Sequence, residues 1–410
     1  MKNIIKLFIG VVAIGFVSCE ADFENPVTEN GFYTSGTADL SKYVAVGNSL
    51  TAGYADGALY ITGQNNSYPN IMAEQFAFAG GGEFSQPLMD DNTGGLLLGG
   101  AQIAANRFVL AVDANGNPGP VLLEGTPTTD VATSVAGPYN NMGVPGAKSF
   151  HLNAPGYGNS AGIASGAANP YYARMATSSS STVIGDAASI GATFFSLWIG
   201  NNDILSYATS GGSGVDQTGN LDPSTYGPND ITDPNVFGAA YSAQVGALTQ
   251  GGAKGVLINI ADVTSIPYFT SVPGPAIPLD AATAAAVNAQ FALYNTQVLP
   301  GLAALGIITP AEAAARVVSF SAGQNYPIIT DNDLTDISAI LQGPPFNLPA
   351  QTAGLLGQLR QENSGDLTLL TAASILGTTP DPSNPLGVVG VSIPVSNEFV
   401  LTASEQERVA

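Results

Sequence analysis

The segment "KYVAVGNSLTAGY" (residues 42–54) is a short apolar run that stops at a glycine and presents a serine directly afterwards. Its β-branched and aromatic residues favour a strand. A second run of this kind, "ATFFSLWIGNNDIL" (residues 192–205), is apolar and rich in aromatic residues until Gly-Asn-Asn-Asp breaks it. Both runs predict buried strands that end in tight turns with polar side chains.

Helical patterns alternate with these strands. A helix with Pro69 in its first turn is predicted at 67–78, a helix, glycine stop and strand at 241–262, and an alanine-rich helix behind Asp280 as its N-cap. Near-continuous apolar strands alternating with helices predict an α/β fold: three layers, α/β/α, around a mainly parallel sheet. Ligands of such sheets bind at the carboxyl ends of the strands, which is where the two polar turns lie.

The rest of the chain is predicted more coarsely. Residues 80–137 and 206–238 are rich in Gly, Asn and Asp and are expected to be irregular insertions near a functional face of one domain spanning 41–410. Two more helices are expected at 350–362 and 365–376.

Composition and charge narrow the function classes. Of 410 residues, 45% are hydrophobic and 10% charged, which is a globular composition. The balance of 10 Lys+Arg against 31 Asp+Glu gives a formal charge of −21, which repels nucleic acid and anionic surfaces. With one histidine and one cysteine the chain offers no set of soft metal ligands, so no metal or other cofactor is expected.

The N-terminus indicates export. A basic start is followed by an apolar run over 7–17, too short to span a bilayer and typical of a secretory signal, with a short membrane anchor as the alternative. The residues 16–19, "FVSC", resemble the lipobox of bacterial lipoproteins, and Cys19 is the only cysteine. We therefore expect a signal peptide over 1–18, lipidation of Cys19, a tether over 19–40, and an outer-membrane lipoprotein that is exposed at the cell surface.

A serine in a tight turn after a strand can expose its hydroxyl to a substrate. Standing alone, Ser49 is more simply a structural turn residue. Two further segments change this: "NNMGVPGA" (140–147), where Asn141 and Gly146 are expected to close a glycine-rich turn, and "GNND" (200–203). An asparagine amide and a glycine N–H that converge on a serine form an oxyanion hole. Taken singly, Gly146 is also compatible with a plain turn and Asn202 with a helix cap.

These segments resemble the three conserved blocks of the SGNH (GDSL-type) hydrolase family, at residues 47–50, 141–146 and 200–203. The resemblance covers roughly 41–262. It implies a flavodoxin-like fold, Ser49 as nucleophile, and an oxyanion hole formed by the N–H groups of Ser49 and Gly146 and the amide of Asn202. The supporting residues are then Gly47, Asn48, Gly200 and Asp203. Asp203 is expected to brace its loop, Asn48 stands where the family has aspartate, and the first two blocks are farther apart than in compact members.

The base is the missing part. The family carries Asp-x-x-His near its C-terminus, whereas the single histidine here, His151, has no aspartate three residues before it and is expected to be a satisfied or surface residue. The acidic residues of 330–336 are expected in loops or caps. The capping-box pattern at 402–405 predicts a short final helix with nowhere to dock. We therefore expect a truncated sequence whose missing segment holds the Asp-x-x-His; the alternative is a natural terminus with an inactive site.

The expected function is that of a serine esterase or lipase acting on carboxylic esters, either lipids or acylated carbohydrates, at the cell surface. Membrane contact is expected through the lipid anchor only, and nucleic acid is not expected as a partner. The alternative is a non-catalytic binding lipoprotein that reuses the fold, because a fold alone does not determine function.

Overall fold

The computed structural model describes residues 33–112, 116, 118–135, 137–384 and 387–410. The predicted signal peptide, Cys19 and the first part of the predicted tether lie outside the described residues. Among the helices that are described, none has the length and apolar character needed to cross a bilayer.

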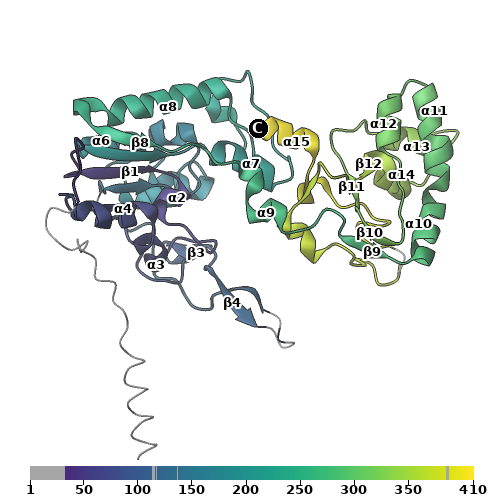
Figure 1. Cartoon of the computed structure of the whole chain (residues 1–410), viewed down its shortest axis with the longest axis horizontal. Helices are drawn as coiled ribbons and strands as arrows, with labels where there is room; N and C mark the ends of the chain where they lie inside the picture. The colour runs from purple at the N-terminus through teal and green to yellow at the C-terminus, as the bar shows by residue number, and fades with distance from the viewer. Residues whose placement is uncertain (1–32, 113–115, 117, 136, 385–386) are drawn as a thin grey trace, which may run out of the picture.

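A four-stranded, all-parallel sheet is the centre of the N-terminal lobe (Figure 1). Its strands are β1 (Tyr43–Gly47), β6 (Asn141–Gly143), β7 (Phe194–Trp198) and β8 (Lys254–Leu257), in the order β6-β1-β7-β8. This confirms the predicted α/β class with a parallel sheet. The outer strand β8 is exposed along its whole length.

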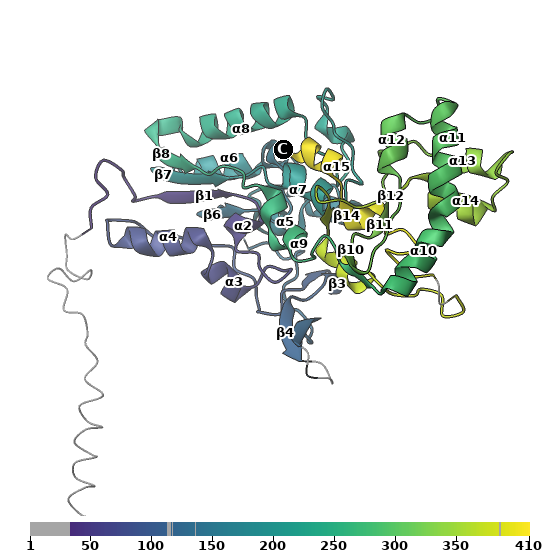
Figure 2. The same cartoon turned by 45° about the vertical axis from the view of Figure 1, so that its right-hand side comes forward.

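Helices cover both faces of this sheet. α6 (Val183–Ser189) and α8 (Pro234–Leu248) lie on one face, and α2 (Ser49–Ala52) and α4 (Tyr68–Ala77) on the other (Figures 1 and 2). Alternate residues of β1 point to the two faces: Val44 and Val46 belong to the core under α6 and α8, whereas Tyr43 and Ala45 pack with α4. Burial on both faces explains why the sequence of β1 is apolar without alternation.

Local signals in the sequence account for the helix starts. Ser67 caps α4, whose first turn contains Pro69 as predicted, and Asp280 caps α10 (Ala281–Leu293) as predicted. Asp233 caps α8, which begins at Pro234. α7 (Asn202–Thr209) extends into the predicted second insertion, so the irregular segment is only 210–233.

The first predicted insertion, 80–137, is not simply a loop. It contains two antiparallel hairpins, β2 (Leu96–Leu98) with β3 (Ala101–Ala104), and β4 (Phe108–Val112) with β5 (Pro118–Leu122). Its apolar residues pack with Ala52 of α2 and with Leu59, which follows α2 closely in the chain. The insertion thus packs against α2, and the expectation that it is irregular was wrong.

The chain beyond residue 262 builds a second lobe with its own core (Figure 2). Its largest buried cluster draws only on residues 277–391, so the last third of the predicted single domain packs largely on itself. The helices and strands of this lobe and its connections are α9 (Pro267–Thr270), β9 (Ile277–Leu279), α10, α11 (Leu299–Ala304), α12 (Pro310–Ala315), β10 (Gly323–Asn325), β11 (Ile328–Thr330), α13 (Ser338–Gln342), α14 (Ala350–Gly357), β12 (Leu359–Gln361), β13 (Leu367–Thr368) and β14 (Val400–Leu401).

Two expectations for this lobe were wrong. The helix predicted at 350–362 ends at Gly357 and is followed by β12. The segment 365–376 forms the short strand β13 and a 3-10 helix, Leu370–Ser374, because its apolar residues pair with β14 and fill the core rather than one helical face. The acidic residues of 330–336 lie in a loop, as expected, and Asp331 and Asp333 also form ion pairs, with Arg360 and Arg408 respectively.

The final helix, α15 (Ala403–Val409), has the predicted capping box between Thr402 and Glu405. The expectation that it has nowhere to dock was wrong. Val409 is buried in a cluster with Tyr207 of α7, and Arg408 donates a hydrogen bond of 2.8 Å to the Tyr207 hydroxyl. α15 therefore joins the second lobe to the helix that follows β7.

Candidate active site

The three predicted blocks meet at the carboxyl ends of three neighbouring strands, which we call the sheet edge below. In the register of the parallel strands, Gly47 at the end of β1 is opposite both Gly143 of β6 and Trp198 of β7. Neighbouring strands lie about 4.8 Å apart, so the turn after β1 is one strand spacing from each of the other two turns. Ser49, Gly146 and Asn202 follow these strand ends by two, three and four residues respectively.

Ser49 is the first residue of α2 and is half-buried. Asn48 caps this helix: its side-chain oxygen accepts a hydrogen bond of 3.1 Å from the Leu50 N–H. The first N–H groups of a helix have no intrahelical acceptor, so the Ser49 N–H remains free to point at a ligand. The turn thus presents both a hydroxyl and an N–H from one residue.

Close packing of α2 on the strand ends explains two glycines. A Cβ atom at Gly47 would lie 2.2 Å from Thr51 Oγ1 and 2.3 Å from the Trp198 carbonyl oxygen. At Gly143 it would lie 2.3 Å from the Ala52 nitrogen. Only glycine lets α2 sit directly on β1 and β6, and this position brings Ser49 to the sheet edge.

The two other predicted donors lie in the turns after β6 and β7. Gly146 is exposed and has φ +79°, a left-handed conformation that favours glycine. Asn202 begins α7, and its Nδ2 donates a hydrogen bond of 2.9 Å to the Ala147 carbonyl oxygen. That bond uses one of the two protons on the amide nitrogen and leaves the other available.

Asp203 braces the same two turns. Its carboxylate accepts hydrogen bonds from the Ser149 N–H at 2.8 Å and from the Ser149 hydroxyl at 2.7 Å. Burial raises the pKa of Asp203, although these two bonds act in the opposite sense. Nearby Lys148 is also buried, which lowers its pKa, and its ammonium donates to the Asp230 carbonyl oxygen. Asp203 is therefore occupied in holding the loop, as its predicted supporting role requires.

Asn141 does not close a turn as predicted; it lies within β6 and is buried. Its Nδ2 donates to the Thr51 carbonyl oxygen at 2.9 Å, and its Oδ1 accepts from the Gly143 N–H at 3.0 Å. Asn141 therefore ties the end of α2 to β6. Asn141 thus helps to position the site and does not itself face a ligand.

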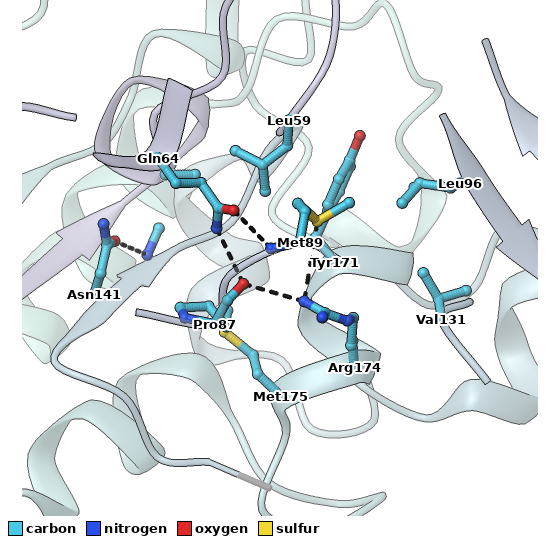
Figure 3. A pocket seen from close by; sticks show the side chains of 12 residues that line it. Leu59, Gln64, Pro87, Met89, Leu96, Val131, Asn141, Tyr171, Arg174 and Met175 are labelled. Atoms are coloured by element: carbon cyan, nitrogen blue, oxygen red, sulfur yellow. Dashed lines mark hydrogen bonds between the residues drawn. The ribbon is translucent and has the colours of Figure 1, made fainter. Parts of the chain in front are cut away.

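Behind α2 lies a small cavity of about 10 Å³, shown in Figure 3. Gln64 crosses it, donating to the Pro87 carbonyl oxygen at 3.0 Å and accepting from the Met89 N–H at 2.7 Å. The buried Arg174 donates to the same Pro87 oxygen at 3.1 Å. A space of this size holds about one water molecule, so it is a packing defect and not a substrate site.

Buried polar atoms without a partner gather at the same sheet edge. Within the described residues, six buried side-chain atoms have no hydrogen-bond partner. Three of them belong to the first and third blocks or to the strand before the third: Asn48 Nδ2, Trp198 Nε1 and Asn201 Oδ1. Such atoms are rare in folded proteins and cost free energy, so their concentration here is typical of a functional site.

A large open cavity of about 860 Å³ begins beside the third block. Gly200 lines it with φ +119°, and a Cβ at this position would lie 2.5 Å from Ile260 and 2.9 Å from Phe237. Its far wall is α15, with Val409 and Arg408. Sequence reasoning missed this cavity because its walls come from five separate segments of the chain.

His151 lies in the 3-10 helix Ser149–Asn153 and is held between aromatic rings. Its ring stacks on Tyr157 with centroids 4.6 Å apart, and its Nδ1 accepts a hydrogen bond of 3.1 Å from the Lys148 N–H. Burial, with a smaller effect of Lys148, lowers the pKa of His151 to about 4. None of the hydrogen bonds or ion pairs found among the described residues joins its side chain to a carboxylate.

Two further residues of the site gave no sequence signal. Ser149 and Thr51 are common residue types in unremarkable contexts, and only the contacts with Asp203 and Asn141 reveal their roles. In the part of the chain that the structure describes, no group of three or more His, Cys, Asp or Glu side chains is arranged to hold a metal ion.

Comparisons with known proteins found no match to any family model, curated protein or solved structure.

Proposed function

We propose that the protein is a serine hydrolase of carboxylic esters with Ser49 as its nucleophile. The observation that carries this proposal is the meeting of three separate turns at one sheet edge, with the Asn202–Ala147 hydrogen bond linking the two that flank Ser49. One of these turns offers a hydroxyl, and all three offer N–H donors.

The strand order supports the SGNH-type assignment. Numbered along the chain, the four parallel strands lie in the order 2-1-3-4, which agrees with the first four strands of the flavodoxin-like order 2-1-3-4-5. The direction of the strand order reverses at β1, and ligands of doubly wound sheets bind at that switch point. Ser49 follows β1 directly.

The chemistry assigns one role to each group. Ser49 Oγ attacks the ester carbonyl carbon and loses its proton to a base, while the carbonyl oxygen becomes an oxyanion. The N–H groups of Ser49 and Gly146 and the free amide proton of Asn202 stabilise that charge. Collapse of the intermediate expels the alcohol, which takes up a proton, and leaves an acyl-serine that water hydrolyses.

His151 is not the base in this proposal. Its Nδ1 is occupied by the Lys148 N–H, and its pKa of about 4 is far from the value that favours proton transfer at neutral pH. Because His151 is the only histidine of the sequence, the proposal leaves the base unassigned; the family resemblance implies an Asp-x-x-His motif in that role. Without a base, Ser49 remains a weak nucleophile.

The cavity beside Gly200 supports an acyl group as part of the substrate. Its apolar lining includes Ile204, Phe237, Ile260 and Val263, and it begins two residues from Asn202. These apolar side chains favour binding of an acyl chain over binding of a charged group or a sugar. We therefore propose a lipid ester or an acylated carbohydrate as substrate.

The test supplies the base from solution. Hydrolysis of p-nitrophenyl acetate by the chain from Glu20 onward is measured with increasing imidazole, beside Ser49→Ala and His151→Ala. The expected result is slow hydrolysis that imidazole accelerates in wild type and His151→Ala, but not beyond the solution rate in Ser49→Ala. Intact-mass analysis should find one acetyl group, located on Ser49.

Equal imidazole-dependent rates in wild type and Ser49→Ala exclude the hydrolase. A non-catalytic binding protein is the second candidate, favoured if ester analogues bind Ser49→Ala and wild type equally while neither is acylated.

We further propose an exported outer-membrane lipoprotein anchored at Cys19. Intact mass of protein from the membrane fraction tests this, since any mature N-terminus other than an acylated Cys19 excludes it.

A further inference from the structure

The hairpin formed by β4 and β5 carries an apolar face that, among the described residues, is covered only at its base. The cross-strand pairs are Phe108 with Leu122, Leu110 with Pro120, and Val112 with Pro118. Side chains of directly opposed residues lie on the same face of a hairpin. All six of these residues are exposed, with Leu110 78% and Val112 65% accessible to solvent.

The hairpin is attached to the site only at its base. The Phe108 N–H donates to the Asp56 carbonyl oxygen at 2.8 Å, and the Phe108 ring lies against Gly57. Arg107 forms a long ion pair of 3.9 Å with Asp56. From this base, a few residues after α2, the strands project away from the lobe (Figures 1 and 2).

A free apolar hairpin is unfavourable in water. Two-stranded hairpins are marginally stable by themselves, and exposed apolar residues side by side usually mark an interaction surface. Neither strand contains an Asp, Glu, Lys or Arg residue. The face therefore fits an apolar occupant and offers no charge to a polar one.

Two features argue against a second copy of the chain as the occupant. Pro118 and Pro120 have no N–H, so the outer edge of β5 is a poor template for an added strand. Two copies, each with a formal charge of −21, also repel one another. The same charge disfavours an anionic membrane, whereas an apolar face without charged residues suits a neutral lipid surface.

The position of the hairpin agrees with such a surface. β4 and α4 lie on the same side of the central sheet (Figures 1 and 2), and Tyr33, the first described residue, contacts Phe78 at the end of α4 with ring centroids 5.9 Å apart. Both Phe78 and Ile71 of α4 are exposed. The chain thus enters the fold on the side that carries these apolar residues.

We propose that the β4–β5 hairpin docks on an electrically neutral lipid surface and inserts its apolar face at the interface. This contact is separate from the anchor proposed at Cys19 and does not depend on catalysis by Ser49. It turns the sheet edge that carries Ser49 toward lipid, because the base of the hairpin lies beside that edge.

The test uses the chain from Glu20 onward, without lipid or signal peptide, and vesicles of phosphatidylcholine. Co-sedimentation compares wild type with Leu110→Thr/Val112→Thr. The matched control is Val215→Thr/Leu221→Thr, which removes the same two residue types at positions 58% and 65% exposed. We expect the hairpin variant to bind at least about tenfold more weakly, since two buried apolar side chains are lost, and the control to bind like wild type.

A second measurement detects a new signal on binding and does not rely on a loss of binding. In Leu110→Trp the emission should shift to the blue with vesicles, and in Leu221→Trp it should not. Absence of wild-type binding, or equal weakening in both double variants, overturns the proposal. So does a dimer in light scattering that Leu110→Thr/Val112→Thr dissociates, because the occupant is then a second copy. Stronger binding to anionic than to neutral vesicles overturns it as well.

Discussion

The side-chain amide of Asn202 donates a hydrogen bond of 2.9 Å to the carbonyl oxygen of Ala147. These residues belong to the turns after β7 and β6, which are separated by β1 in the sheet. The bond therefore closes the edge of the sheet around the end of β1, where Ser49 begins α2. It orients the remaining amide proton of Asn202 as one donor of the proposed oxyanion hole.

Asn202→Ala should lower the Ser49-dependent, imidazole-assisted hydrolysis by about 10²–10³-fold, because one oxyanion donor is lost. The measurement is the initial rate of p-nitrophenyl acetate hydrolysis after subtraction of the Ser49→Ala rate. Asn235→Ala, an exposed position at the start of α8, is the control and should react like wild type. A rate unchanged in Asn202→Ala removes this residue from the oxyanion hole.

Gly47→Ala should destabilise the protein by about 1–3 kcal/mol or more, because the added methyl group overlaps Thr51 and the Trp198 carbonyl oxygen. Gly238→Ala provides the matched control: it lies in α8 with open space around its Cβ position, and should stabilise by up to about 1 kcal/mol. Urea unfolding measures both. Similar stabilities for the two variants rule out the close packing of α2 on the strand ends.

Arg360→Met should cost about 3–5 kcal/mol. Arg360 is buried between Asp331, at 2.6 Å, and Asp366, at 2.6 Å, and its removal leaves two buried carboxylates unpaired. Arg107→Met should cost only about 1 kcal/mol, since its ion pair with Asp56 is long and partly exposed. Chemical denaturation of the two variants gives the comparison, and equal losses contradict a special role for the buried cluster.

The buried Glu362 should make the protein less stable as the pH rises. Burial raises the pKa of Glu362 to about 8, and the Asp366 carboxylate acts in the same sense, while the Thr368 hydroxyl and Arg360 oppose it. The folded state therefore binds a proton that the unfolded state releases between about pH 4.5 and pH 8. The stabilisation is complete below about pH 4.5 and is lost as the pH rises through 8.

Glu362→Gln should flatten the stability profile in this window, and its free energy of unfolding should exceed that of wild type near pH 8. Denaturation midpoints at several pH values provide the measurement, with the exposed Glu398→Gln as control. A Glu362→Gln profile as steep as that of wild type shows that another group is responsible.

His151 should titrate far below the usual range. Its pKa of about 4, caused by burial and by Lys148, is below the ordinary value of 6.5, so the unfolded state binds the extra proton between these values. The contribution of His151 to stability is present above about pH 6.5 and is lost as the pH falls toward 4. Because the chain has one histidine, a single imidazole resonance in NMR reports this pKa directly. A value near 6.5 reopens His151 as a candidate base.

The sequence alone determined the parts of the protein that depend on local patterns. The apolar runs before Gly47 and Gly200 predict buried parallel strands. Pro69, Asp280 and Thr402 mark the starts of three helices, α4, α10 and α15. Such signals are read within a few residues, because a helix cap bonds to N–H groups of its own first turn and a strand buried on both faces needs an apolar run in its own sequence. Ser49 could be singled out for the same reason, since a serine after a buried strand is visible in the chain itself.

Which residues act together follows from the packing of distant segments. Asp203 meets Ser149, Asn141 holds α2, and α15 closes a cavity against α7, yet each partner lies tens to hundreds of residues away. The segment 365–376 shows the same limit: its apolar residues suit a helix locally, but pairing with β14 and burial in the core outweigh that preference. Contacts between distant segments follow from how the layers pack, and no local pattern of residues encodes them.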